Sequence, residues 1–83
     1  MKKYTYYLEM EYLCQRAEVA LRSLKNNMLA NVYNYASKGY HQQSEQLSAA
    51  KAEETVGSTL YENLKKLNKW VEHKEVEAAK TRS

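Results

Sequence analysis

Few residues in this chain are of the types that carry out catalysis or bind metals. The chain has one cysteine, Cys14, two histidines, His41 and His73, and ten acidic residues that are all glutamate. It contains no recognisable Ser-His-acid arrangement, no glycine-rich phosphate loop and no Glu-x-x-His pair. We therefore expect both histidines to be solvated and Cys14 to be a small apolar residue within a helix contact. The sequence predicts no enzymatic activity, no metal and no cofactor.

A local group of lysines is the one pattern that suggests nucleic acid. Lys65, Lys66 and Lys69 lie close together in a chain of net charge +3. Phosphate backbones are usually bound by denser positive surfaces, and Glu62 and Glu72 dilute this group. A solvated helix face is the simpler explanation. The alternative function is a homodimeric helical hairpin that binds RNA through the three lysines.

Tyrosine is the most distinctive residue type. The chain has eight tyrosines and one tryptophan but no phenylalanine. A tyrosine ring packs on apolar surface while its hydroxyl reaches water, and Tyr and Trp are enriched in binding hot spots. We therefore expect a surface for a protein partner or a second copy, with an ordinary local core as the alternative. The predicted partner-binding residues are Tyr4, Tyr7, Leu8, Tyr12, Trp70 and Val71 at one end of the molecule, and Leu24, Met28 and Tyr35 at the other.

The composition predicts an all-α protein. There is no proline, there are only two glycines, and glutamate suits a helix interior better than aspartate. Residues spaced three and four apart over 7–35 form one apolar stripe, which predicts a helix that buries this face against another helix. The stripe consists of Tyr7, Met10, Cys14, Ala17, Leu21, Leu24, Met28, Asn31 and Tyr35, of which only Asn31 is polar.

Gly39 lies near the midpoint of the chain and is predicted to form the corner between two helical arms. Ser37 and Lys38 precede it, and a cation in the last turn followed by glycine is typical of a helix C-terminus. We therefore expect an elongated antiparallel helical hairpin. Its parts are a first arm at about 3–37, a turn at about 38–41, a second arm at about 42–79 and a frayed tail at 80–83.

The hairpin predicts which side chains face one another. Tyr7 would lie beside Val71 and Cys14 beside Leu64, so the open end is well packed, whereas Leu24 and Met28 near the turn meet little apolar surface. A two-helix hairpin of this size covers too little of its apolar surface to be stable alone. We therefore expect dimerisation into a four-helix bundle, or a partner protein, to complete it.

Two local alternatives are left open by the sequence. Residues 59–62 fit a capping box with Thr59 as N-cap, so a break at 57–58 would start a third helix. One continuous second arm is favoured, because the two arms then match in length. The second concerns residues 4–12, where Tyr4, Tyr6, Leu8, Met10 and Tyr12 alternate with Thr5, Tyr7, Glu9 and Glu11. This period of two, together with the preference of Tyr and Thr for strands, is typical of a strand. A helix is favoured there, because 13–35 continues without a cap signal.

The hydropathy pattern indicates where in the cell the protein is expected to be located. No window approaches the roughly 20 apolar residues of a membrane-spanning helix, and Glu9 and Glu11 interrupt any leader-like segment after Lys2 and Lys3. A single cysteine favours a reducing compartment, so the expected location is cytoplasmic. The sequence therefore predicts one helical domain over 1–83 that acts as a non-enzymatic protein–protein interaction module, such as a small regulator, inhibitor or assembly subunit.

Overall fold

Helices dominate the computed structural model, which describes residues 1–82. The elements are α1 (Lys3–Ser23), α2 (Asn27–Gln46), α3 (Ala49–Ala52) and α4 (Ser58–Arg82). Within the described range no strand forms, and Lys2 and Thr55 make an isolated antiparallel bridge. The predicted all-α class is therefore confirmed. The alternative of a strand at 4–12 is wrong, because α1 begins at Lys3.

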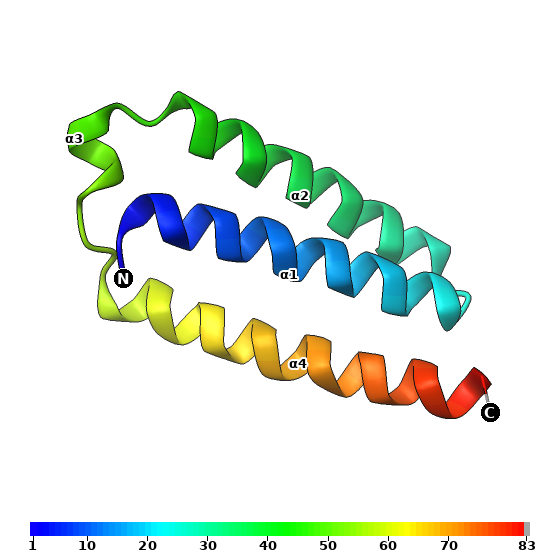
Figure 1. Cartoon of the computed structure of the whole chain (residues 1–83). Coiled ribbons are helices and arrows are strands. Elements are labelled where there is room, and N and C mark those ends of the chain that lie inside the picture. The colour runs from blue at the N-terminus through cyan, green and yellow to red at the C-terminus, as the bar shows by residue number, and fades with distance from the viewer. Residues whose placement is uncertain (83) are drawn as a thin grey trace.

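Helix α1 lies between α2 and α4 in an elongated bundle (Figure 1) with extents of 47, 22 and 16 Å. α2 runs antiparallel to α1, whereas α4 starts near the N-terminus and runs in the same direction as α1. An antiparallel helical hairpin is thus present, but it consists of α1 and α2 alone.

The corner of this hairpin lies at residues 24–26. Lys25 has a left-handed φ of 63°, and its N–H donates to the carbonyl oxygen of Arg22 at 3.0 Å. The N–H of Asn26 donates to the carbonyl oxygen of Leu21 at 2.9 Å. These two bonds form a Schellman motif, in which Lys25 occupies the position that usually holds glycine.

Gly39 lies inside α2, so the prediction that it forms the turn is wrong. The side chain of Asn26 begins α2 by accepting a hydrogen bond from the N–H of Leu29 at 3.3 Å. The predicted arms at 3–37 and 42–79 are wrong for the same reason, since the first contains the corner and residues 38–41 are helical. The apolar stripe concealed the corner, because Leu24 and Met28 keep the helical spacing on either side of it.

Small residues line the side of α2 that packs on α1. The buried positions of α2 are Ala30, Ser37 and Ser44, which are seven residues apart and so form one line along the helix. The hydroxyl of Ser37 donates to the carbonyl oxygen of Asn34 at 2.8 Å, and that of Ser44 donates to His41 at 2.6 Å. Both buried hydroxyls are therefore satisfied within α2, which leaves the two helices free to approach closely.

The segment between α2 and α4 returns the chain to the start of α1. The N–H of Lys3 donates to the carbonyl oxygen of Glu54 at 2.7 Å, and the N–H of Val56 donates to Met1 at 3.0 Å. These bonds place the start of α4 beside the start of α1, which explains why the two helices are parallel. The favoured continuous second arm is therefore wrong, and the alternative of a break before a further helix is confirmed.

The limits of α4 also differ from the prediction. The helix begins at Ser58, two residues before the position that would follow a Thr59 cap, and it continues to Arg82. The frayed tail expected from residue 80 is therefore helical as far as Arg82, and Ser83 lies outside the described residues.

The parallel course of α4 replaces the predicted pairs with others. Val71, expected beside Tyr7, is fully buried in a cluster with Ala17, Leu21 and Ala30. The other core cluster consists of Tyr6, Met10, Leu13, Val56 and Leu64. Leu67 packs against both clusters, so the core is continuous along α1.

Replacing Lys25 with glycine should stabilise the fold by about 1 kcal/mol, because a left-handed conformation costs an L-residue about 1–2 kcal/mol and costs glycine little. The matched control is Lys38→Gly, at an exposed position within α2, where glycine should destabilise by up to about 1 kcal/mol. Urea unfolding followed by circular dichroism measures both changes. A loss of stability in Lys25→Gly would place the corner elsewhere.

Candidate protein-binding surfaces

The most exposed apolar feature of the protein is a line of residues on α2, which we term the outer stripe. It consists of Met28, Val32, Tyr35 and Gly39, whose spacing of four, three and four residues places them on one side of the helix. Met28 is 82% exposed, Tyr35 81% and Val32 57%. The opposite side of α2 packs against α1, so the described chain leaves the stripe uncovered.

The outer stripe carries no charge. Charged residues make up 28% of the chain, yet α2 contains only Lys38 and Glu45 besides His41. Glu45 contacts His41 on the flank of the helix, and Lys38 lines a hollow between α1 and α2. Interface cores are depleted of charged residues, so the stripe has the composition of a surface that becomes buried.

A shallow, open hollow of about 290 Å³ lies beside Gly39 within this surface. Its lining residues are Tyr35, Ala36, Gly39, Tyr40 and Gln43. A methyl group added at Gly39 would have open space around it, with no other part of the protein within 4 Å. A glycine inside a helix costs up to about 1 kcal/mol relative to alanine. The fold of the single chain therefore gives no reason for glycine at this position.

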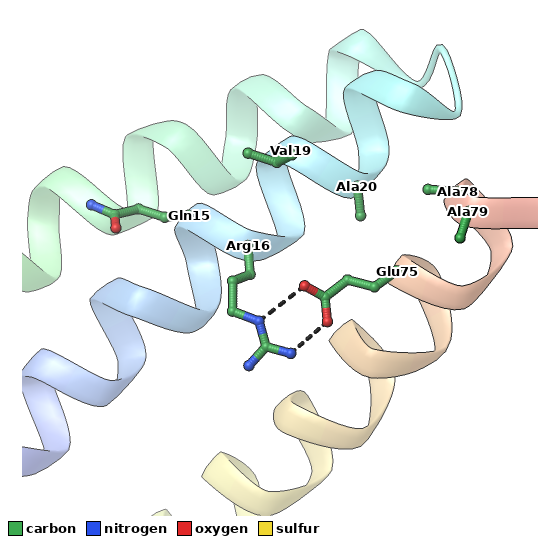
Figure 2. Close-up of a pocket in the computed structure, with 7 residues that line it drawn as sticks. All are labelled: Gln15, Arg16, Val19, Ala20, Glu75, Ala78 and Ala79. Carbon is green, nitrogen blue, oxygen red and sulfur yellow. Dashed lines mark hydrogen bonds and ion pairs between the residues drawn. The ribbon is translucent and has the colours of Figure 1, made fainter. Parts of the chain in front are cut away.

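A second apolar surface, the α1/α4 groove, lies where these two helices run side by side. Its hollow of about 370 Å³ is lined by Gln15, Arg16, Val19, Ala20, Glu75, Ala78 and Ala79 (Figure 2). The guanidinium of Arg16 donates from Nε to Oε2 of Glu75 at 3.0 Å and from Nη2 to Oε1. These bonds lower the pKa of the Glu75 carboxyl. The groove therefore combines apolar walls with a fixed ion pair.

The predicted aromatic cluster at one end of the molecule does not form as a unit. Tyr4, Leu8 and Tyr12 are exposed on α1, with the guanidinium of Arg16 5.5 Å from the ring centre of Tyr12. Tyr7 instead lies against the rings of Tyr6 and Tyr40.

The two predicted residues of α4 lie apart from that end. Val71 belongs to the core, and Trp70 stacks on Tyr33 of α2 with ring centres 5.4 Å apart. The cluster was predicted from an antiparallel pairing, and the parallel course of α4 moves Trp70 and Val71 toward the opposite end of α1. A role of Val71 in binding would require the core to open, whereas a role for the exposed tyrosines stays a prediction.

The other predicted group is divided by the corner. Leu24 is half-buried at the end of α1, while Met28 and Tyr35 belong to the outer stripe. Val32 completes the stripe between them. The helical spacing of 28, 32, 35 and 39 is a sequence signal for this face, but it becomes informative only once the buried line at 30, 37 and 44 is known.

The three predicted nucleic-acid residues lie on α4. Lys65, Lys66 and Lys69 are all exposed, and the ammonium of Lys65 lies 4.6 Å from the ring centre of Tyr61. Glu62 is exposed on the same helix. The lysines therefore form part of a mixed-charge surface.

Polar contacts along one edge join α1 to α2. Glu18 accepts a hydrogen bond from Asn34 at 3.0 Å and also pairs with Arg22, and these contacts lower the pKa of its carboxyl. His41 lies between Glu11 of α1, at 3.2 Å, and Glu45 of its own helix, at 2.6 Å. The hydrogen bond and charge of Glu11, followed by the charge of Glu45, raise the pKa of His41.

Cys14 and His73 are the remaining side chains of types that can act in catalysis or metal binding. Cys14 is buried, and burial raises the pKa of its thiol to about 11, so the thiol is protonated at neutral pH. His73 is exposed and pairs with Glu77 on its own helix. Within residues 1–82 no three His, Cys or Glu side chains are placed to hold a metal ion.

None of the helices in the described part of the chain combines the length and apolar character that crossing a lipid bilayer requires.

Sequence reasoning missed the α1/α4 groove and its ion pair. Arg16 and Glu75 are far apart in sequence, and only the parallel course of α4 brings them together. Neither residue lies in a local pattern that distinguishes it from other charged helix residues, so the sequence held no signal for this contact.

Comparisons with protein-family models, with characterised proteins and with solved structures found no match to this chain.

The His41 contact predicts a pH dependence of stability. Because the folded-state pKa of His41 is raised, its contribution is complete below the ordinary histidine pKa of about 6.5 and is lost as pH rises through the folded value. We expect the stability difference between the natural protein and His41→Gln to be larger at about pH 6 than at about pH 9. Thermal unfolding across this range measures it.

His73→Gln is the matched control for that experiment, because His73 contacts a carboxylate of its own helix and joins no two helices. A pH dependence in which the two substitutions are indistinguishable would show that the Glu11–His41 contact does not stabilise the α1–α2 pair.

Proposed function

We propose that this protein is a non-enzymatic interaction protein, which binds another protein or a second copy of itself through exposed apolar side chains. The observation that carries the proposal is the outer stripe, where Met28 and Tyr35 are more than four-fifths exposed on a neutral helix face. Anchors at positions i, i+4 and i+7 are typical of helices that lie in the groove of a partner. A small regulator, inhibitor or assembly subunit would have such a face.

Binding is favoured over catalysis by the state of the few reactive side chains. Cys14 is buried with a thiol pKa of about 11, and nucleophilic cysteines normally have lowered pKa values and some exposure. His41 already contacts two carboxylates. Neither residue lines the outer stripe.

Nucleic-acid binding by a homodimer is the second candidate. Lys66 and Lys69 favour it, because both are exposed and neither pairs with an acidic residue in the described part of the chain. Glu62 and Glu72 lie on the same helix and oppose it, since their negative charges repel the phosphate backbone. Retention on RNA or DNA at low salt that is lost in a Lys66→Glu/Lys69→Glu variant would favour this candidate over the first.

The double variant Met28→Ser/Tyr35→Ser should lose at least about tenfold in association, because exposed Tyr and Met side chains that act as binding anchors are each worth more than about 1 kcal/mol. Its fold should be preserved within about 0.5 kcal/mol, since both side chains are on the surface. Association is measured by sedimentation of the purified chain and by quantitative affinity capture from an extract of its natural host.

The matched control for this experiment is Tyr61→Ser/Val76→Ser, which removes an exposed tyrosine and an exposed aliphatic side chain from α4. We expect the control to keep most of the association. If neither double variant changes any association of the chain, the interaction proposal is wrong.

A further inference from the structure

We propose that the outer stripe of α2 binds the outer stripe of a second copy of this chain, in an antiparallel arrangement about a twofold axis, with Tyr35 of each chain seated in the hollow at Gly39 of the other. This inference rests on the proposed function and names the partner and the geometry of the contact.

The stripe contains both halves of such a contact. Tyr35 is a large side chain that projects from the helix with 81% of its surface exposed, and the hollow at Gly39 lies one helical turn further along. A twofold axis that passes between residues 35 and 39 brings each Tyr35 over the Gly39 of the partner, so one favourable contact is made twice. Isologous interfaces have this property, because the same patch is used on both subunits.

Gly39 gives an independent indication of an intermolecular contact. The helix tolerates the cost of a central glycine although a Cβ there would meet no other part of the chain. Small residues on a helix face allow another helix or side chain to approach the backbone closely. Within one chain nothing makes this approach, and a second copy would.

The charge distribution suits self-association. A surface that meets its own copy places identical groups near one another, so single-signed charge on it would repel. The stripe and its continuation at Gln42 and Gln46 carry no charge. Lys38 lines the hollow between α1 and α2 and acts on Glu18, whose pKa is lowered mainly by Asn34. Lys38 therefore lies on the flank of α2 that borders α1 and outside the outer stripe.

The available area is sufficient for a dimer. Aromatic side chains bury about 150–250 Å² each, so two largely exposed Tyr35 rings supply roughly a third of the about 1,000 Å² that a specific interface needs. The remainder comes from Met28 and Val32 of both chains, which the same axis places against Gln46 and Gln42. The helix length of about 30 Å allows all of these contacts at once.

Sedimentation equilibrium of the purified full chain tests the proposal. We expect the mass to rise with concentration from the 9.7 kDa monomer to twice that value. Tyr35→Ala should weaken the dimer on the order of thirtyfold, as expected for an interface hot spot. Gly39→Gln should weaken it comparably by filling the hollow, while its open surroundings and better helix propensity preserve the monomer fold.

Tyr61→Ala is the matched control, because it removes an exposed tyrosine from α4 rather than from α2, and it should leave the dimer unchanged. A chain that is monomeric up to about 1 mM, or a dimer that Tyr35→Ala and Gly39→Gln do not weaken, overturns the proposal. If such a monomeric chain still loses a captured partner in Met28→Ser/Tyr35→Ser, the stripe binds a different protein and only the self-association is wrong.

Spin labels test the orientation of the two helices. Nitroxides can be attached at position 46 of a Cys14→Ala/Gln46→Cys variant. They should lie about 27 Å apart along the helix, given 1.5 Å per residue and a twofold axis near residue 37. A parallel pair would hold the same labels at little more than the about 10 Å between packed helices. A label separation of about 10 Å contradicts the antiparallel contact, and a separation of about 27 Å supports it.

Discussion

The line of small residues at Ala30, Ser37 and Ser44 is the constraint on which the exposed surface depends. Because this line is buried against α1, the rotation of α2 about its own axis is fixed, and the residues on its other side must face outward. Met28, Val32 and Tyr35 are on that side. Their exposure is therefore a consequence of the burial of the opposite side of α2 against α1 and not of a loose or unpacked helix. Rotating the stripe inward would place two serine hydroxyls and an alanine on the surface and force tyrosine and methionine into a contact that has room only for small side chains.

The segment that connects α2 to α4 determines what happens on the other side of α1. Its main-chain bonds to the N-terminal residues start α4 beside the start of α1, so the core is built from parallel positions: Leu64 with Met10, and Val71 with Ala17 and Leu21. α4 thus covers the apolar side of α1 that α2 leaves open. With α2 and α4 both in place, Ala17, Leu21 and Val71 are buried within the single chain, without a helix from a second copy. A second copy would therefore bind to a chain whose core is already buried. The hairpin predicted from the sequence, in contrast, would have needed a partner to cover its apolar surface.

Composition and helical periodicity were sufficient to predict the fold class. They placed Met28 and Tyr35 on a stripe expected to be buried, and only the register of the predicted hairpin left this end under-covered; both residues are more than four-fifths exposed. Composition and periodicity failed at the corner, because glycine is the usual residue in a left-handed helix cap and the chain uses Lys25 there. The signal that was present, Asn26 as an N-cap, is weak beside a stripe that continues through it with unbroken spacing. The error then spread, since a corner at Gly39 implies an antiparallel partner for α1 and predicts contacts of Trp70 and Val71 at the wrong end. The ion pair of Arg16 with Glu75 depends on the direction of α4, which is a property of the whole chain and leaves no local trace.

The two apolar surfaces differ in what a partner must displace. Covering the α1/α4 groove would remove water from Arg16 and Glu75, whose side chains are 26% and 39% exposed, and desolvating an ion pair can cost more than its attraction returns. The outer stripe has no charged group to desolvate. It does have a hydroxyl, and this explains the use of tyrosine in place of phenylalanine at position 35. When the ring is exposed, its hydroxyl can hydrogen-bond water; if a partner covered the ring, its apolar faces would be buried while the hydroxyl reached the rim of the contact, where Gln43 lines the hollow. A side chain with both properties suits a surface that alternates between the two states.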